Sequence, residues 1–318
     1  MNYESTIHLL EKGEFAEAIN LVGELLEENP DDLDFISAYY SIKYWQNREH
    51  LLYNLKNKPL SYLIEEWEKF EAKLKEKKYK HNSITLALKK FIIQKIVQQL
   101  RNKFNREGLE DSDLPLLLSL AKQLLSLHDF NGARELLTYS KHLNDHNPVI
   151  YFLMGDTFCL EAEISGNTQL YFKGLSIIRD GYLLDANHFP LEDVQSKFLN
   201  NIIKELNFIY EGQIQRLQAW LSIYILLKSF HPELRKLTVD EIAEVEEEIQ
   251  RLEKEILEVS EKYYEKTLAR LIFYYLILIH SLIYHYSDDE RLNEILIQLE
   301  KFSPKIYNEV MKILSKEL

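Results

Sequence analysis

Three groups of residues have side chains that could bind ligands or take part in catalysis. His142 and His146 are four residues apart, so on a helix they would share a face, as metal ligands do. They also fit the last turn of a helix, where imidazole is favourable, and we expect no metal site. Cys159 has no matching histidine and acid signature of a nucleophile, so we expect a small buried residue.

The third group is a basic segment, residues 73–106, which has eleven Lys or Arg residues and one acid and so carries about +10. The whole chain carries −13, so the remainder carries about −23. The basic side chains could contact phosphates of nucleic acid or an anionic membrane. Alternatives are a solvated face or a pole that attracts the acidic segment 240–265, and the negative remainder disfavours a long polyanion. The nine residues of this basic patch are Lys73, Lys75, Lys77, Lys78, Lys80, Lys89, Lys90, Arg101 and Lys103.

Motifs of common catalytic sites are absent from the sequence, which has no glycine-rich phosphate loop, no His-Glu-x-x-His pair and no paired Glu-x-x-His motifs. We therefore expect a protein that is not an enzyme and has no cofactor. The single cysteine excludes an intramolecular disulfide, and residues 1–10 lack the basic and apolar regions of a signal peptide. We expect a cytoplasmic protein.

The elements that position these residues are expected to be helices. Nine glycines and seven prolines among 318 residues, with abundant Leu, Ile, Glu and Lys, favour helix nearly throughout. Apolar residues recur at helical spacing between capping residues, prolines and glycines. Outside the repeated segments, the expected helices span 34–47, 60–78, 84–104, 191–210 and 214–230, with two short ones after Ser287 and Ser303.

Residues 114–186 contain two copies of a 34-residue pattern. Slots of the patterns W-x2-L-G-x2-Y and A-x3-F are filled by Leu117, Leu120, Ala121, Leu124, Ala133 and Leu137 in one copy and by Tyr151, Met154, Gly155 and Phe158 in the next. Ala121 and Gly155 are 34 residues apart, and small residues are expected there because the two helices of a unit approach closely. The chain therefore resembles the tetratricopeptide repeat family, whose units are pairs of helices.

A third copy of the pattern lies at residues 4–32. Gly13 stands at its turn, where the missing Cβ permits a positive φ, and Pro30 ends its second helix. We expect its first helix to be shortened, since the copy begins so near Met1. The three copies together cover about a third of the chain.

The second central copy departs from the family pattern. Gly174 and Ile178 fit its second helix only if about seven extra residues, near 165–171, lie in a loop between its two helices. Asp145 stands where the closing proline of the preceding copy belongs, and large apolar residues replace the usual Trp and Tyr.

In tetratricopeptide proteins, first-helix residues that point away from the second helices line a groove that holds a peptide or helix of a partner. The resemblance places six residues of this chain there: Leu118, Lys122, Leu125, Phe152, Asp156 and Cys159. Such a groove would be mainly apolar, and Lys122 could pair with Asp156. The alternative is that these residues pack against another helix of the same chain, which leaves no open groove.

A long helix is expected over residues 238–286. Thr238 and Glu241 form a capping box, and neither proline nor glycine follows until Pro304. Unbroken, the helix would be about 73 Å long. Its second half, 271–286, is apolar almost all round but falls short of a membrane span, so we expect a buried helix rather than a transmembrane one.

The first half of that segment has an a/d seam of apolar residues over 242–263, as in coiled coils. Its acidic flanks could pair with the basic segment of a neighbouring subunit, head to tail. The alternative, which we favour slightly, is an internal helical hairpin against residues 198–217.

We predict an all-α fold, a right-handed tetratricopeptide-like superhelix. Its regions would be 1–110 with N-terminal repeats, 111–190 with the central pair, and 191–318 with the long helix and two capping helices. The predicted function is a scaffold or adaptor that binds another protein, as a peptide or a helix, in the groove. It would be a homo-oligomer or a subunit of a larger assembly.

The alternative function is binding of a polyanion, nucleic acid or an anionic membrane surface, by the basic patch. The composition and residues 44–48 are also similar to those of tetratricopeptide proteins of spirochaetes, some of which belong to flagellar motor assemblies. This similarity suggests a candidate assembly and assigns no residue.

Overall fold

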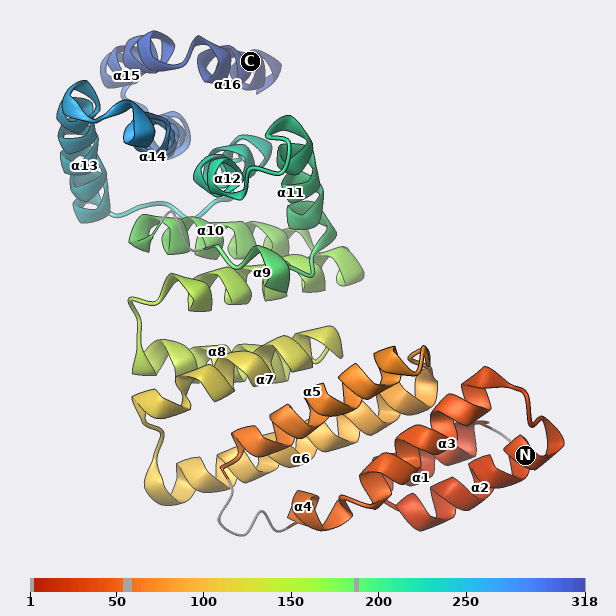
Figure 1. Cartoon of the computed structure of the whole chain (residues 1–318). Coiled ribbons are helices and arrows are strands. Elements are labelled where there is room, and N and C mark those ends of the chain that lie inside the picture. The colour runs from red at the N-terminus through yellow and green to blue at the C-terminus, as the bar shows by residue number, and fades with distance from the viewer. Residues whose placement is uncertain (1–2, 54–58, 186–188, 318) are drawn as a thin grey trace. The chain divides into compact units, whose positions relative to one another are not determined.

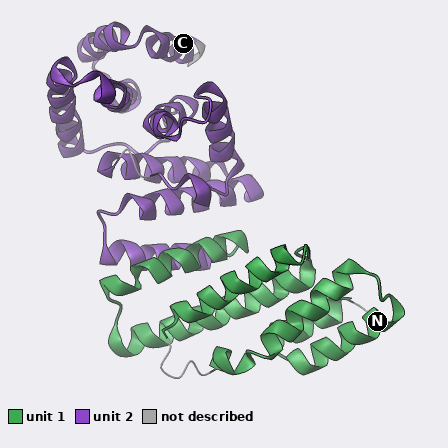
Figure 2. Cartoon of the chain, viewed as in Figure 1, with its two compact units in different colours: residues 1–129 green, residues 130–318 purple. Residues whose placement is uncertain are grey.

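A computed structural model describes residues 3–53, 59–185 and 189–317 (Figure 1). Within these ranges the chain is helical, at 83%, with sixteen α-helices packed against their neighbours and no β-strand. The all-α prediction is therefore confirmed. The chain divides into two compact units, Met1–Asp129 and Phe130–Leu318 (Figure 2). That boundary falls between the two helices of the first central copy, and the three predicted regions stay a prediction.

Unit 1 is built from helices joined by short connections. Its elements are α1 (Tyr3–Lys12), α2 (Phe15–Glu28), α3 (Leu33–Gln46), α4 (Glu49–Tyr53), α5 (Ser61–Glu76), α6 (Ser83–Glu107), the 3₁₀ turn η1 (Asp111–Asp113) and α7 (Leu114–Ser126). The α1 helix packs on α2 and α6, and α3 packs on α2. Between α1 and α2, Gly13 has φ +81°, and a Cβ there would lie 2.6 Å from Cζ of Phe91. The predicted turn glycine is thus required both by its backbone and by the space around it.

An aromatic cluster joins α3 to α5. The indole rings of Trp45 and Trp67 stack with centroids 5.8 Å apart, and Phe70 contacts both rings. Both tryptophans are almost completely buried, at 0% and 1% exposed. Aromatic side chains of this size bury a large apolar area per residue and so contribute strongly to the core.

Unit 2 contains the remaining helices. They are α8 (Phe130–Leu143), α9 (Pro148–Ser165), α10 (Thr168–Leu184), the 3₁₀ turn η2 (Leu191–Asp193), α11 (Lys197–Ile209), α12 (Ile214–Lys228), α13 (Val239–Glu258), α14 (Glu261–Ser281), the π-helical turn η3 (Leu282–Tyr286), α15 (Asp289–Phe302) and α16 (Pro304–Glu317). One hydrophobic core runs through this unit, with members from Phe152 to Val310.

The predicted close approach of two helices occurs between α9 and α10. A Cβ on Gly155 would lie 2.7 Å from the carbonyl oxygen of Gly174, and a Cβ on Gly174 would meet Gly155 at the same distance. The expected loop of about seven residues between these helices is wrong. The turn is only Gly166 and Asn167, and the extra residues lengthen both helices, because Asn167 caps α10 by accepting hydrogen bonds from its first backbone amides.

The expected unbroken helix over 238–286 is also wrong. Val259 and Ser260 have extended backbones, with ψ of 141° and 153°, and they separate α13 from α14. The break lets α13 pack on α14. The part of the a/d seam that lies on α13 is buried in this hairpin, whereas Tyr263 at the end of the seam is 52% exposed. The predicted internal pairing is therefore right, but its partner is α14 and not residues 198–217. The buried seam residues are Ile242, Val245, Ile249, Leu252 and Ile256.

The apolar α14 is the central helix of unit 2, where it packs against α12, α13 and α15. Among the described residues, the segment Glu261–Tyr286 is the one helix long and apolar enough to cross a membrane. Yet 78% of its apolar window is buried within the fold. Length and composition are weak evidence for a membrane span when neighbouring helices already cover the segment.

Candidate functional site

The predicted groove residues are divided between the two units. Leu118, Lys122 and Leu125 lie on α7, where Leu125 is buried and Leu118 and Lys122 are half-buried. Phe152, Asp156 and Cys159 lie on α9 in unit 2 and are 0–1% exposed. Phe152 and Cys159 belong to the hydrophobic core of that unit, as the alternative of a filled groove expects.

Asp156 has a structural role that sequence reasoning missed. Its two carboxylate oxygens accept hydrogen bonds from the backbone amides of Gln195 (2.7 Å) and Ser196 (3.0 Å). On the same helix, Glu163 accepts from the next two amides, of Lys197 (2.9 Å) and Phe198 (2.8 Å). Two carboxylates of α9 thus cap the start of α11.

This capping also corrects a boundary. The helix predicted from residue 191 begins only at Lys197, because η2 and an extended stretch come first. Burial raises the pKa of Asp156. Burial likewise raises the pKa of the Cys159 thiol well above its usual value, so this cysteine is not a thiolate.

Part of the predicted basic patch is paired inside unit 1. Lys89 contacts Glu71 at 3.9 Å and donates to Ser126 Oγ at 3.1 Å, and burial lowers its pKa. Lys90 contacts Glu11 at 3.7 Å. Lys103 binds Asp113 at 2.6 Å, in the 3₁₀ turn before α7. Arg101 is exposed on α6.

The five remaining lysines surround the turn between α5 and α6, and we name them the basic corner: Lys73, Lys75, Lys77, Lys78 and Lys80. All five are exposed. The amines of Lys73 and Lys77 lie 5.3 Å from the ring centroids of Tyr44 and Tyr40 on α3. In the described part of the chain, Lys75, Lys78 and Lys80 have no acidic group within 4 Å.

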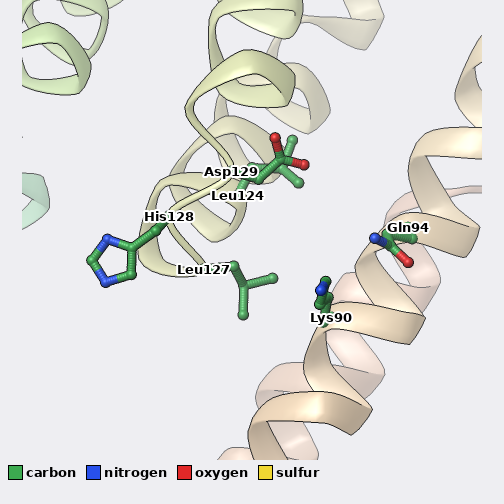
Figure 3. A pocket seen from close by; sticks show the side chains of 6 residues that line it. All are labelled: Lys90, Gln94, Leu124, Leu127, His128 and Asp129. Atoms are coloured by element: carbon green, nitrogen blue, oxygen red, sulfur yellow. The ribbon is translucent and has the colours of Figure 1, made fainter. Parts of the chain in front are cut away.

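A small pocket of about 280 Å³ lies between α6 and the end of α7. Lys90 and Gln94 face the C-terminal turn of α7, while the His128 ring points away from them (Figure 3). Leu127 contributes an apolar side to the same space. His128 has a positive φ of 58°, which ends α7 there.

Unit 2 has a larger concavity, of about 750 Å³, which we name the cleft. Side chains of α8, α9, α10, α13, α14 and the segment before α13 line it. Tyr151 and Tyr274 supply aromatic surface, and Leu183, Leu184 and Val245 supply aliphatic surface. Charged residues form the rest of the lining.

One wall of the cleft is fixed by Arg235. Its guanidinium binds both carboxylate oxygens of Glu241, at 2.8 and 3.0 Å, and Asp180 at 2.9 Å. The hydrogen bonds from Arg235 lower the pKa of Glu241 to about 2. Behind this wall the buried Arg179 donates to the backbone oxygen of Arg235 at 2.9 Å. A bidentate pair held at both ends gives the wall a defined shape.

A second wall is fixed by Glu248, which accepts from Arg270 and from Arg251, both at 2.7 Å. The hydrogen bond from Arg251 lowers the pKa of Glu248. Between the two walls, Glu244 on α13 is exposed and has no partner among the described residues. The cleft thus has paired charges in its walls, one acid without a partner in the described part of the chain, Glu244, and one cation in Lys141, whose amine lies 4.7 Å from the ring centroid of Tyr151.

Comparisons of the chain with family models, with curated proteins and with solved structures found no match. The tetratricopeptide resemblance therefore stays a prediction.

Sequence reasoning identified one residue of the cleft by a local motif, since Glu241 belongs to the capping box with Thr238. The others come from segments up to about 130 residues apart, and nothing in their local sequence connects them. These residues are brought together only by the tertiary fold, so the sequence alone could not identify them. Among the described residues, no group of three histidine, cysteine or acidic residues is arranged to hold a metal ion.

Proposed function

We propose that the protein is a cytoplasmic, non-enzymatic scaffold of tetratricopeptide-like repeats, which binds a segment of a partner protein in the cleft of unit 2. The repeats would supply a rigid helical framework, and the cleft would supply the binding surface. The protein would act as a subunit or adaptor of a larger assembly.

The observation that carries this proposal is the composition of the cleft. Tyrosine and arginine are the residues that contribute most to protein interfaces, and the cleft presents Tyr151, Tyr274, Arg235 and Arg270 around aliphatic side chains. Both arginines are already held by carboxylates, so little side-chain entropy is lost when a partner binds. A volume of about 750 Å³ accommodates several side chains of a peptide.

The predicted groove is a weaker candidate for this role. Three of its six residues are inside the core of unit 2. A partner could reach them only if helices of that unit moved apart, whereas the cleft is open in the folded chain.

The test is site-specific photo-crosslinking. A photoreactive amino acid at Leu184, which lines the cleft and is 41% exposed, should crosslink a discrete partner in source cells. The same amino acid at Phe208, which is 86% exposed and outside the cleft, is the control and should not. Glu244→Arg should reduce the Leu184 product. Equal products from both positions, or a product unaffected by Glu244→Arg, would contradict the proposal.

A second candidate function is polyanion binding at the basic corner. The specific observation in its favour is that Lys75, Lys78 and Lys80 are exposed and have no acidic partner in the described residues. An affinity pull-down with and without nuclease, at low and high salt, separates the two functions. Recovery that disappears with nuclease favours the corner, and a protein that is retained after nuclease treatment favours the cleft.

A further inference from the structure

We propose that the occupant of the cleft is the basic corner of a second copy of this chain, so that copies associate head to tail. This inference rests on the proposed function in one respect, because it takes the cleft as the binding surface. It adds the identity of the partner and the residues that it brings.

The acidic surface extends from the cleft along the outer face of α13. Asp240, Glu244 and Glu247 are spaced four and three residues apart, which places them in one row on the helix. All three are exposed, and the described residues provide none of them with a partner. By contrast, the acids behind them, Glu241 and Glu248, are neutralised by arginines.

The basic corner presents a row of matching geometry. Lys73 and Lys77 are four residues apart, at about 6 Å along the axis of α5, and Asp240 and Glu244 have the same separation on α13. Lys75, Lys78 and Lys80 add charge around that row. The amine of Lys73 lies over the ring of Tyr44, and that of Lys77 lies over the ring of Tyr40. These contacts hold the two amines and limit the entropy lost on docking.

Charge complementarity favours this occupant over nucleic acid. Unit 2 contains 30 acidic and 20 basic residues, so its net charge of −10 attracts a basic surface and repels a polyanion. On α6, Lys89, Lys90 and Lys103 are paired with Glu71, Glu11 and Asp113, which shortens any stripe of free cations that continues from the corner along this helix. Long nucleic acids are bound by such stripes.

The two surfaces differ and lie in different units, so the contact is heterologous. An open chain of copies always ends in one free corner and one free cleft, so growth continues until a ring closes. Since exposed charges supply the attraction, the affinity falls as salt rises.

The experiment is sedimentation velocity of the purified full chain across concentrations, at about 20 mM and about 500 mM salt. The wild-type protein should associate at low salt and dissociate at high salt. One variant reverses the corner (Lys75→Glu, Lys78→Glu, Lys80→Glu), and another reverses the α13 row (Asp240→Lys, Glu244→Lys, Glu247→Lys). Each variant alone should associate at least about tenfold more weakly than the wild type.

In an equimolar mixture of the two variants, the unchanged corner of one faces the unchanged row of the other, and the two reversed surfaces are also opposite in charge, so the mixture should associate again. That recovery also shows that both variants are folded. The control that matches the corner variant is Lys12→Glu with Lys204→Glu and Lys266→Glu. It replaces three exposed lysines outside the corner and changes the net charge by the same amount as the corner variant, so it should behave as the wild type.

A wild-type chain that stays monomeric at about 100 µM and low salt overturns the inference. So does association that persists unchanged in the corner variant. If Leu184 nevertheless crosslinks a different protein in cells, the cleft remains the binding site and only the self-association fails. If the corner reversal removes nuclease-sensitive material but leaves the sedimentation unchanged, the corner binds nucleic acid and the inference is wrong.

Discussion

Phe152 and Phe208 show how far the environment of a single residue decides its role in this protein. Phe152 is 1% exposed, and its ring centroid lies 4.7 Å from that of Phe189 and 4.8 Å from that of Tyr182. Phe208 is 86% exposed near the end of α11. The first is part of the core, and the second contributes little to it.

We expect Phe152→Asp to cost unit 2 more than about 3 kcal/mol of unfolding free energy, because it removes a buried ring and introduces an unpaired buried charge. Phe208→Asp, its matched control, should change stability by less than about 0.5 kcal/mol. Urea unfolding followed by circular dichroism measures both. Similar midpoints for the two variants would place Phe152 outside the core and reopen the predicted groove.

His280 is a buried titratable residue on α14. It is 1% exposed, and its Nε2–H donates to the backbone oxygen of His231 at 2.8 Å, which fixes the neutral tautomer. Burial lowers its pKa to about 4, while Arg179 and His285 add repulsion for the charged form. In the unfolded chain this histidine binds a proton near pH 6.5. The contribution of the neutral, buried His280 to the unfolding free energy is therefore complete above that pH and is lost as the pH falls toward 4.

The predicted loss is on the order of 3 kcal/mol between pH 6.5 and pH 4. His280→Gln keeps a donor for the His231 oxygen but does not titrate, so its unfolding free energy should fall less steeply over this range. His285, whose pKa burial also lowers, should leave a residual slope. Urea unfolding at several pH values measures how the unfolding free energy depends on pH. Equal slopes in the variant and the wild type would show that His280 does not control this dependence.

At the scale of elements, the crossing of α9 and α10 depends on two glycines. A Cβ on Gly155 would lie 2.4 Å from Cγ1 of Ile178 and 2.7 Å from a backbone oxygen. The side-chain contact could relax, but the backbone contact cannot without separating the helices.

Gly155→Ala should therefore destabilise the protein by about 1–3 kcal/mol. Gly23→Ala is the control, because Gly23 lies inside α2 without a positive φ and a Cβ there would meet its nearest atom at 3.8 Å. That change should stabilise by about 0.5–1 kcal/mol, since alanine is the better helix former. A lower urea midpoint for Gly155→Ala with a higher one for Gly23→Ala supports the close crossing of α9 and α10. Shifts of the same sign in both variants contradict it.

Helices with their own start signals and apolar spacing were predictable from the sequence. The helices expected at 34–47 and 84–104 are examples, since α3 spans Leu33–Gln46 and α6 spans Ser83–Glu107. The break at Val259 and Ser260 was not predictable, because neither residue is a strong helix breaker and the gain comes from packing α13 on α14. The late start of α11 has the same kind of origin, in the carboxylates of α9.

The candidate site was less predictable than the fold. The basic corner is a local sequence feature and was found, but which lysines are free depends on acids as distant as Glu11 and Asp113. The cleft has no local pattern at all, since its walls form only when α10, α13 and α14 come together.

At the scale of the whole molecule, the division at Asp129 implies that each unit has its own core. Every member of the main hydrophobic cluster of unit 2 lies between Phe152 and Val310. The ion pairs of the cleft walls are also internal to that unit.

We therefore expect residues 130–318 to fold without unit 1. The fragment should show a cooperative urea transition, and its His280-dependent loss of stability at low pH should match that of the full chain. A fragment that is helical but unfolds without cooperativity would show that unit 1 is needed to complete the core.

The central position of α14 has a consequence for biosynthesis. A helix as apolar as Leu271–Leu282 is an aggregation hazard while it is uncovered. Two of the three helices that cover it, α12 and α13, precede it in the chain and leave the ribosome first. The two-residue joint at Val259 and Ser260 then lets each newly made turn of α14 fold back on α13 as it emerges. Two of the three helices that cover α14 are therefore synthesised before α14 itself.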